Sequence, residues 1–69
     1  MTLKILLNGD PYEIAEPVVT VSGLLAQLDI DARRVAVEHN LNVLKRTAFD
    51  NTPLRDGDQV EIVNFVGGG

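Results

Sequence analysis

The sequence predicts an α+β domain in which a mixed sheet of four to five strands carries one main helix on one face. Near the start, two alternating apolar segments are joined by Asn8-Gly9, which favours a tight hairpin because both residues tolerate positive φ. From Thr20 onward, apolar residues recur at helical spacing, and further segments rich in β-branched residues follow. A chain of 69 residues is long enough for one such domain.

The first hairpin is predicted from the period of a strand, in which alternate side chains share a face. This period assigns the following residues of the first strand to the core: Leu3, Ile5 and Leu7. In the second, antiparallel strand it assigns Tyr12, Ile14 and Val18. Pro11 and Pro17 stand near the two ends of that strand. Because proline has no N–H to donate, we expect the second strand to lie at an edge of the sheet.

The helix is predicted to begin after Thr20, whose hydroxyl can accept a hydrogen bond from a free N–H of the first turn. A stripe of apolar residues follows at positions i, i+3, i+4 and i+7: Val21, Leu24, Leu25 and Leu28. We interpret this stripe as the face of the helix that packs on the sheet. The segment Asp29-Ile30-Asp31 ends the helix.

The next part of the sequence predicts two strands and a loop. Residues 34–38 form a third strand with Val35 and Val37 inward, and residues 41–44 form a short fourth strand. Residues 47–52 form a loop with one helical turn, in which Phe49 fills the core.

The last strand is predicted over residues 59–65, after a turn at Asp56-Gly57-Asp58. The helix crosses over between the first and last strands, so we expect these two strands to run parallel as neighbours at the centre of the sheet. This order of elements is that of a β-grasp roll.

The sequence ends in Gly67-Gly68-Gly69, directly after the last predicted strand. A backbone without Cβ atoms can pass through a slot that is too narrow for any other residue. We therefore interpret the Gly69 carboxylate as the working group, presented by a β-grasp domain over residues 1–66 and a flexible tail over residues 67–69. The alternative interpretation is an ordinary frayed chain end without a function.

The composition argues against several classes of function. The net charge of −4 disfavours nucleic acid as a partner, since phosphate binding needs clusters of lysine and arginine, and it favours a basic partner surface. Without cysteine the chain can form neither a thiolate nucleophile nor a thiolate zinc site. The sequence shows no signal-peptide layout and no apolar run that could span a membrane, so we expect a cytoplasmic protein.

The polar residues predict neither a metal site nor a catalytic set. His39 is the only histidine, and we interpret it as a solvated residue at a strand end. Asp56 and Asp58 are interpreted as turn formers, because their loop contains no third metal ligand.

Five short segments along the chain match the pattern of a known family. They are Asn8-Gly9, Thr20-Val21-x-x-Leu24-Leu25, Val35-Ala36-Val37-Glu38-x-Asn40, Asp56-Gly57-Asp58-x-Val60-Glu61-Ile62-Val63 and Val66-Gly67-Gly68-Gly69. In these segments the sequence resembles the ThiS family, the ubiquitin-like sulfur carriers of thiamin biosynthesis. One departure is Asn40-Leu41-Asn42, where the family often has Asn-Gly.

The resemblance implies that a ThiF-like activating enzyme adenylates the Gly69 carboxylate with ATP. Sulfur from a cysteine desulfurase pathway then replaces AMP and leaves a thiocarboxylate, from which a ThiG-like thiazole synthase takes the sulfur. The ATP and magnesium sites would belong to the activating enzyme. This chain would then need no cofactor of its own, and it would be a co-substrate and not an enzyme.

The strand period also predicts a docking face on the side of the sheet opposite the helix. We expect Leu6 and Val63 to lie close together there, with Phe65 beside them at the start of the tail. The predicted partner-binding set is completed by Val66, Gly67 and Gly68.

Other functions stay open at this point. The chain could carry sulfur for molybdopterin or another sulfur-containing metabolite. It could be a protein modifier whose Gly69 forms an isopeptide bond with a lysine, or an interaction module whose terminus has no role.

Overall fold

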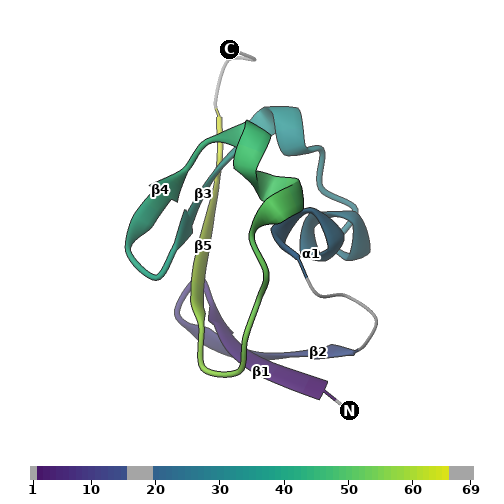
Figure 1. Cartoon of the computed structure of the whole chain (residues 1–69), viewed down its shortest axis with the longest axis vertical. Helices are drawn as coiled ribbons and strands as arrows, with labels where there is room; N and C mark the ends of the chain where they lie inside the picture. The colour runs from purple at the N-terminus through teal and green to yellow at the C-terminus, as the bar shows by residue number, and fades with distance from the viewer. Residues whose placement is uncertain (1, 16–19, 66–69) are drawn as a thin grey trace.

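The described part of the chain, residues 2–15 and 20–65 of the computed structural model, forms one five-stranded sheet with helices on one side (Figure 1). The strands are β1 (Thr2–Leu7), β2 (Asp10–Ala15), β3 (Val35–His39), β4 (Asn42–Leu44) and β5 (Gln59–Asn64). The helices are α1 (Val21–Gln27) and two 3₁₀ helices, η1 (Ala32–Arg34) and η2 (Arg46–Asn51). The order of the strands across the sheet is β2-β1-β5-β3-β4.

The β1–β2 hairpin is confirmed, and its turn has the geometry that its sequence predicts. Asn8 and Gly9 have φ angles of 51° and 86°, as a two-residue hairpin turn requires. The two strands pair in antiparallel register from Thr2 with Ala15 to Leu7 with Asp10. The predicted edge position of β2 is also confirmed. Pro17 and Val18 lie outside the described residues.

The central position of β5 is confirmed as well. β5 runs parallel to β1, with Leu6 opposite Gln59, and antiparallel to β3, with Val37 opposite Ile62. Each predicted strand boundary agrees with the structure to within one residue, apart from the second strand, which ends at Ala15 in the described part. The structure therefore has the predicted β-grasp arrangement.

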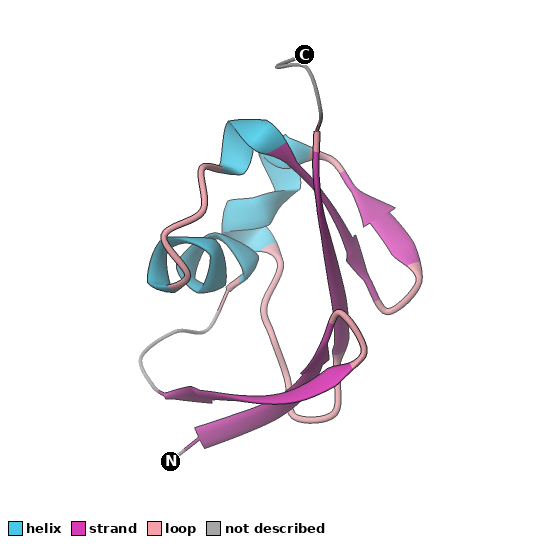
Figure 2. Ribbon diagram, turned by 180° about the vertical axis from the view of Figure 1, so that it is seen from behind, coloured by secondary structure: helices cyan, strands magenta, loops and turns pink. Residues whose placement is uncertain are grey.

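Helix α1 begins as predicted and covers one face of the sheet (Figure 2). The Thr20 hydroxyl accepts a hydrogen bond of 3.1 Å from the Gly23 N–H, which caps the first turn. Three residues of the predicted stripe are fully buried, namely Val21, Leu24 and Leu25. No helix among the described residues is both long and apolar enough to cross a membrane.

The core lies between the helices and the inner face of the sheet. Its buried apolar residues are Ile5, Ile14, Val21, Leu24, Leu25, Val35, Val37, Phe49, Leu54 and Val60. Phe49 enters this core from η2, which confirms the predicted helical turn and the predicted role of that phenylalanine. The short helix η1 was not predicted; its N-cap is Asp31, whose carboxylate accepts a hydrogen bond from the Arg33 N–H.

The β3–β4 hairpin has the same kind of turn as β1–β2 but a different sequence. Asn40 and Leu41 have φ angles of 51° and 73°. Leucine in the left-handed region is strained, because its Cβ approaches the following carbonyl oxygen. The Leu41 side chain is 80% exposed, so few packing contacts offset this strain.

We predict that Leu41→Gly stabilises the protein by up to about 1 kcal/mol, because glycine removes the left-handed strain at a modest cost in chain entropy. The reverse change at the matching position, Gly9→Leu, is expected to destabilise it by about 1–2 kcal/mol. A Cβ at Gly9 would meet no atom within 4 Å, so this loss would report backbone strain alone. Urea denaturation followed by circular dichroism measures both changes. Equal stability of Leu41→Gly and the parent chain would show that the strain in the turn does not exceed the entropy cost of glycine, and lower stability would contradict the prediction outright.

Candidate functional site

The candidate site is the end of β5 together with the exposed face of the sheet, because the predicted working group follows this strand. Figure 1 shows β5 running along the molecule from the Asp56–Asp58 turn toward the chain end. The Phe65 N–H donates a hydrogen bond of 2.8 Å to the Arg34 carbonyl oxygen. The backbone is therefore held by the sheet as far as Phe65. Val66, Gly67, Gly68 and Gly69, which are predicted site residues, lie outside the described part of the chain.

We call the face of the sheet that carries no helix the outer face. Its central residues are Leu6, Ala36, Glu38, Val43, Gln59, Glu61 and Val63. Three of the predicted docking residues are indeed exposed: Leu6 by 39%, Val63 by 60% and Phe65 by 52%. Exposed large apolar side chains near a chain end are a common feature of partner-binding surfaces.

The prediction that Leu6 and Val63 lie close together is wrong. Leu6 is opposite Gln59, and Val63 is four residues further along β5. This offset corresponds to about 13 Å along the strand. The cause is the register of the parallel β1–β5 pair, since β1 turns away at Asn8 and pairs with only the first part of β5. Val63 is instead opposite Ala36 of β3.

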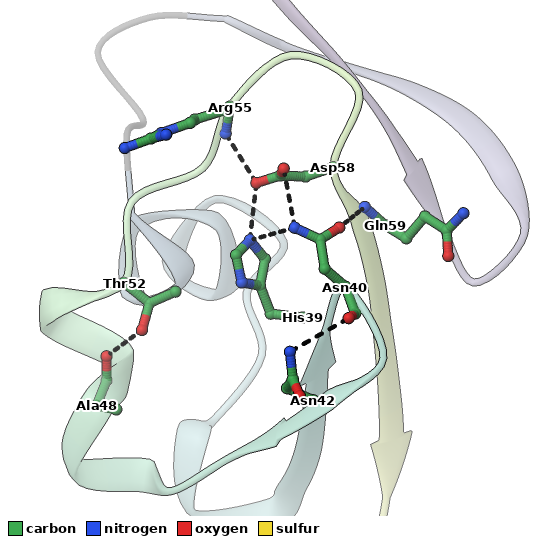
Figure 3. A network of polar contacts seen from close by, with 8 residues as sticks. All are labelled: His39, Asn40, Asn42, Ala48, Thr52, Arg55, Asp58 and Gln59. Carbon is green, nitrogen blue, oxygen red and sulfur yellow. Dashed lines mark hydrogen bonds and ion pairs between the residues drawn. The ribbon is translucent and has the colours of Figure 1, made fainter.

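A network of polar side chains, which the sequence did not predict, lies at the other end of β5. Figure 3 shows Asp58 at the centre of a network of hydrogen bonds. Its carboxylate lies 2.7 Å from the His39 Nε2, and it accepts hydrogen bonds from the Arg55 N–H at 2.9 Å and the Asn40 Nδ2 at 3.1 Å. The Asn40 side-chain oxygen accepts a hydrogen bond from the Gln59 N–H. The network therefore joins the β3–β4 turn to the start of β5.

The prediction that His39 is solvated is wrong, because its side chain is only 20% exposed and contacts Asp58. The signal that could have revealed this was the strand period, which places position 39 on the same face as Val35 and Val37. The prediction that Asp58 forms a turn is confirmed by its hydrogen bond from the Arg55 N–H. Asp56 does more than form the turn, since its carboxylate accepts a hydrogen bond from the Lys4 N–H of β1.

The surroundings of Asp58 favour its charged form. Burial raises the pKa of this carboxyl, but hydrogen bonds from His39, the Arg55 N–H and Asn40 outweigh the burial and hold the pKa below its ordinary value. Among the described residues no three His, Cys, Asp or Glu side chains lie together as a metal would need. Asp58 precedes Phe65 by seven residues of extended chain, or about 23 Å, so the network is remote from the end of β5. It connects the β3–β4 turn to the start of β5 at the end of the strand away from Phe65.

Known proteins resemble this chain along nearly its whole length. It matches the ThiS family over residues 5–69. The sulfur carrier protein ThiS of Bacillus subtilis (strain 168) is 35% identical to it, over 91% of this chain and 96% of that protein. The thiazole synthase of Paramagnetospirillum magneticum is 39% identical over 97% of this chain, which spans only 20% of that protein.

A solved structure extends the likeness to the fold. The crystal structure of the thiamine biosynthesis protein (ThiS) of Geobacter metallireducens is 40% identical to this chain. The two structures superpose with a TM-score of 0.83. The match covers 97% of this chain and 100% of the Geobacter chain. The fold is therefore the ubiquitin-like β-grasp.

The Asp58 network leads to a prediction about pH. Because the pKa of Asp58 is lower in the folded than in the unfolded chain, the unfolded chain binds this proton first as the pH falls. The stability that Asp58 contributes is thus present above pH 4 and is lost progressively below it. We expect Asp58→Ala to destabilise the protein by about 1–3 kcal/mol at pH 7, because buried donors lose their acceptor. The variant's stability is also expected to depend less on pH below 4.

Urea unfolding by circular dichroism at pH 7, 5, 4 and 3 measures both effects. Asp29→Asn is the control, because Asp29 is exposed at the end of α1 and asparagine tolerates its φ of 59°. An Asp58→Ala variant with the stability of the parent at pH 7 would contradict the role assigned to this network.

Proposed function

The chain belongs to the ThiS family, and from this membership we propose that it is a sulfur carrier for thiazole formation in thiamin biosynthesis. The observation that supports this most directly is the extent of the match, which runs through the glycine end to residue 69. The Bacillus subtilis relative, matched over 96% of its length, is itself named a sulfur carrier protein.

In the proposed reaction the Gly69 carboxylate is the reacting group. A carboxylate oxygen attacks the α-phosphorus of ATP on an activating enzyme, pyrophosphate leaves, and an acyl-adenylate forms. Sulfur at the oxidation level of sulfide then attacks the acyl carbon, AMP leaves, and a thiocarboxylate results. Thiazole synthase takes this sulfur, and an oxygen atom from water or from the sulfur acceptor replaces it on the acyl carbon, so that the carboxylate is regenerated. The chain acts as a co-substrate, while ATP, magnesium and the catalytic groups belong to its partners.

The structure supports the proposal through the way it carries the chain end. β5 is hydrogen-bonded to strands on both sides, and its backbone is held as far as Phe65. A glycine tail that continues from this fixed point can enter a narrow active site, because its residues have no side chains. Val63 and Phe65 supply exposed apolar contacts beside it, and we propose that Val66, Gly67 and Gly68 contact the partner as well.

The partners follow from the same proposal. A segment similar to this chain lies within the thiazole synthase polypeptide of Paramagnetospirillum magneticum, which supports a thiazole synthase as the sulfur acceptor. The activating enzyme would be ThiF-like, and the sulfur would come from a cysteine desulfurase pathway as a persulfide that two thiols, oxidised to a disulfide, reduce to the level of sulfide. Because activation consumes ATP, we propose that the protein works in the cytoplasm.

The deciding experiment is intact-protein mass spectrometry after incubation with a candidate activating enzyme, ATP and a sulfur donor. We expect the mass to increase by the exchange of one oxygen for one sulfur. The product should then support thiazole formation by thiazole synthase. Sulfur transfer only to molybdopterin precursors, or conjugates of higher mass on a denaturing gel, would replace the proposal by the other carrier or modifier functions. An unchanged mass would reject a carrier function.

We predict that Gly68→Val lowers the rate of ATP–pyrophosphate exchange by roughly 100-fold, because a branched Cβ misplaces the carboxylate in the activating enzyme. The fold is expected to survive, since the substitution lies after the last strand. Ala15→Val adds the same branched side chain at an exposed position of β2 and serves as the control. Exchange by Gly68→Val at the rate of the control would contradict the slender-tail interpretation.

A further inference from the structure

The outer face contains two carboxylates directly opposite one another on neighbouring strands. Glu38 of β3 pairs with Glu61 of β5, and Val43 of β4 is the next residue in the same row. All three side chains are exposed. Opposed side chains of an antiparallel pair have Cβ atoms about 4.5–5.5 Å apart, so both glutamates extend from neighbouring points of the outer face and their carboxylates can reach one shared cation.

Within the protein this arrangement of two carboxylates does not stabilise the fold. Like charges directly opposite one another destabilise a sheet. Among the described residues, neither Glu38 nor Glu61 takes part in an ion pair; the recorded pairs join Asp31 to Arg33 and Arg34, and His39 to Asp58. The two carboxylates are thus placed together without a cation from the described part of the chain.

Their position on the outer face makes them part of any docking surface there. Glu61 is two residues from Gln59, the partner of Leu6, and two residues from Val63. Each step is about 7 Å along the strand. A partner that covers both exposed apolar positions must therefore also cover the carboxylates. Removing two unpaired charges from water is unfavourable, so such a partner must supply a positive charge.

We infer that the outer face docks a cationic protein surface, with one arginine side chain of the partner seated between Glu38 and Glu61. The inference rests on the proposed function, since the partner is an enzyme that acts on Gly69. Arginine suits the site better than lysine, because its planar guanidinium presents five donors and can bind two carboxylates at once. Two exposed valines adjoin the pair: Val43 lies across from Glu38 on β4, and Val63 lies two residues along β5 from Glu61.

A metal ion fits this pair less well than an arginine. No third His, Cys, Asp or Glu of the described chain joins the two carboxylates in a group that could hold a metal. The exposed valines beside the pair also favour a protein surface, because such side chains contribute to binding only when a partner covers them.

The test uses Glu38→Gln/Glu61→Gln, which keeps the shape of both side chains and removes their charge. The melting temperature of this double variant is expected to equal or exceed that of the parent, because the repulsion across the strands is gone. Its dissociation constant for the activating enzyme or for thiazole synthase is expected to rise at least about tenfold, because the partner's arginine loses its ligands. Misfolding would lower both the melting temperature and the affinity. A variant that is at least as stable as the parent but binds more weakly has therefore lost contacts with the partner.

Asp29→Asn/Asp50→Asn is the matched control. It removes the same charge from exposed residues just after α1 and within η2, and asparagine at position 50 keeps an acceptor for the Ser22 hydroxyl. Binding weakened equally by both double variants would show that net charge alone attracts the partner and would overturn the inference. The melting temperature and dissociation constant of the single variants Glu38→Gln and Glu61→Gln are measured as well. If the double variant does not fold, the single variants are compared with the parent instead.

The outcomes separate this inference from the proposed function. If the parent chain is converted to the thiocarboxylate and the glutamine double variant binds both enzymes as tightly as the parent, the inference is wrong and the proposed function stands. If the parent chain binds neither enzyme, both are rejected.

Discussion

The structure depends on β5 being hydrogen-bonded on both sides, although neither neighbouring strand extends along its whole length. Side-chain amides from two hairpin turns supply the missing partners. The Asn8 Oδ1 accepts a hydrogen bond of 2.7 Å from the Ile62 N–H, and the Asn8 Nδ2 donates one to the Ile62 carbonyl. On the other side the Asn40 Oδ1 accepts a hydrogen bond of 2.8 Å from the Gln59 N–H. Without these bonds, the Gln59 N–H and both backbone polar groups of Ile62 would lose the partners that tie the central strand to the two turns.

This constraint explains why the two turns contain asparagine. Each turn needs residues that tolerate positive φ, and asparagine meets that need while its amide imitates a peptide group. At position 8 the amide continues the β1 ladder by one more step after the backbone has turned away. At position 40 the amide also donates to Asp58, which links the turn to the buried carboxylate. The turns thus shape the hairpins and hold the central strand.

The two-residue period of β5 separates stability from recognition within one strand. Val60 and Ile62 face the helices and belong to the core or pack against it. Glu61 and Val63 face outward beside the point where the chain leaves the sheet. Because adjacent residues have opposite roles, the outer face can be altered with little effect on the core. Asp58 itself lies at the opposite end of the strand, about 23 Å from Phe65.

The sequence by itself determined the five strands and the main helix of this protein, but not the short helix η1, because these larger elements follow local rules of periodicity, capping and turn formation. The period of apolar residues predicted β1, α1 and β3 with their buried faces, and the cap at Thr20 and the turn at Asn8-Gly9 are formed as predicted. The crossover rule also predicted the parallel β1–β5 pair. The glycine end and the family resemblance predicted where the candidate site is. They did not predict how the exposed residues of the sheet are arranged beside it.

The tertiary structure alone decided how the strands are offset and which polar groups meet. The β1–β5 register depends on hydrogen bonds between residues more than fifty positions apart, and no local pattern encodes it. It separates Leu6 from Val63 and places Glu61 between them. The burial of His39 against Asp58 depends on two turns meeting at the start of β5. Periodicity describes one strand at a time, while register and polar pairing are properties of strands brought together by the whole fold.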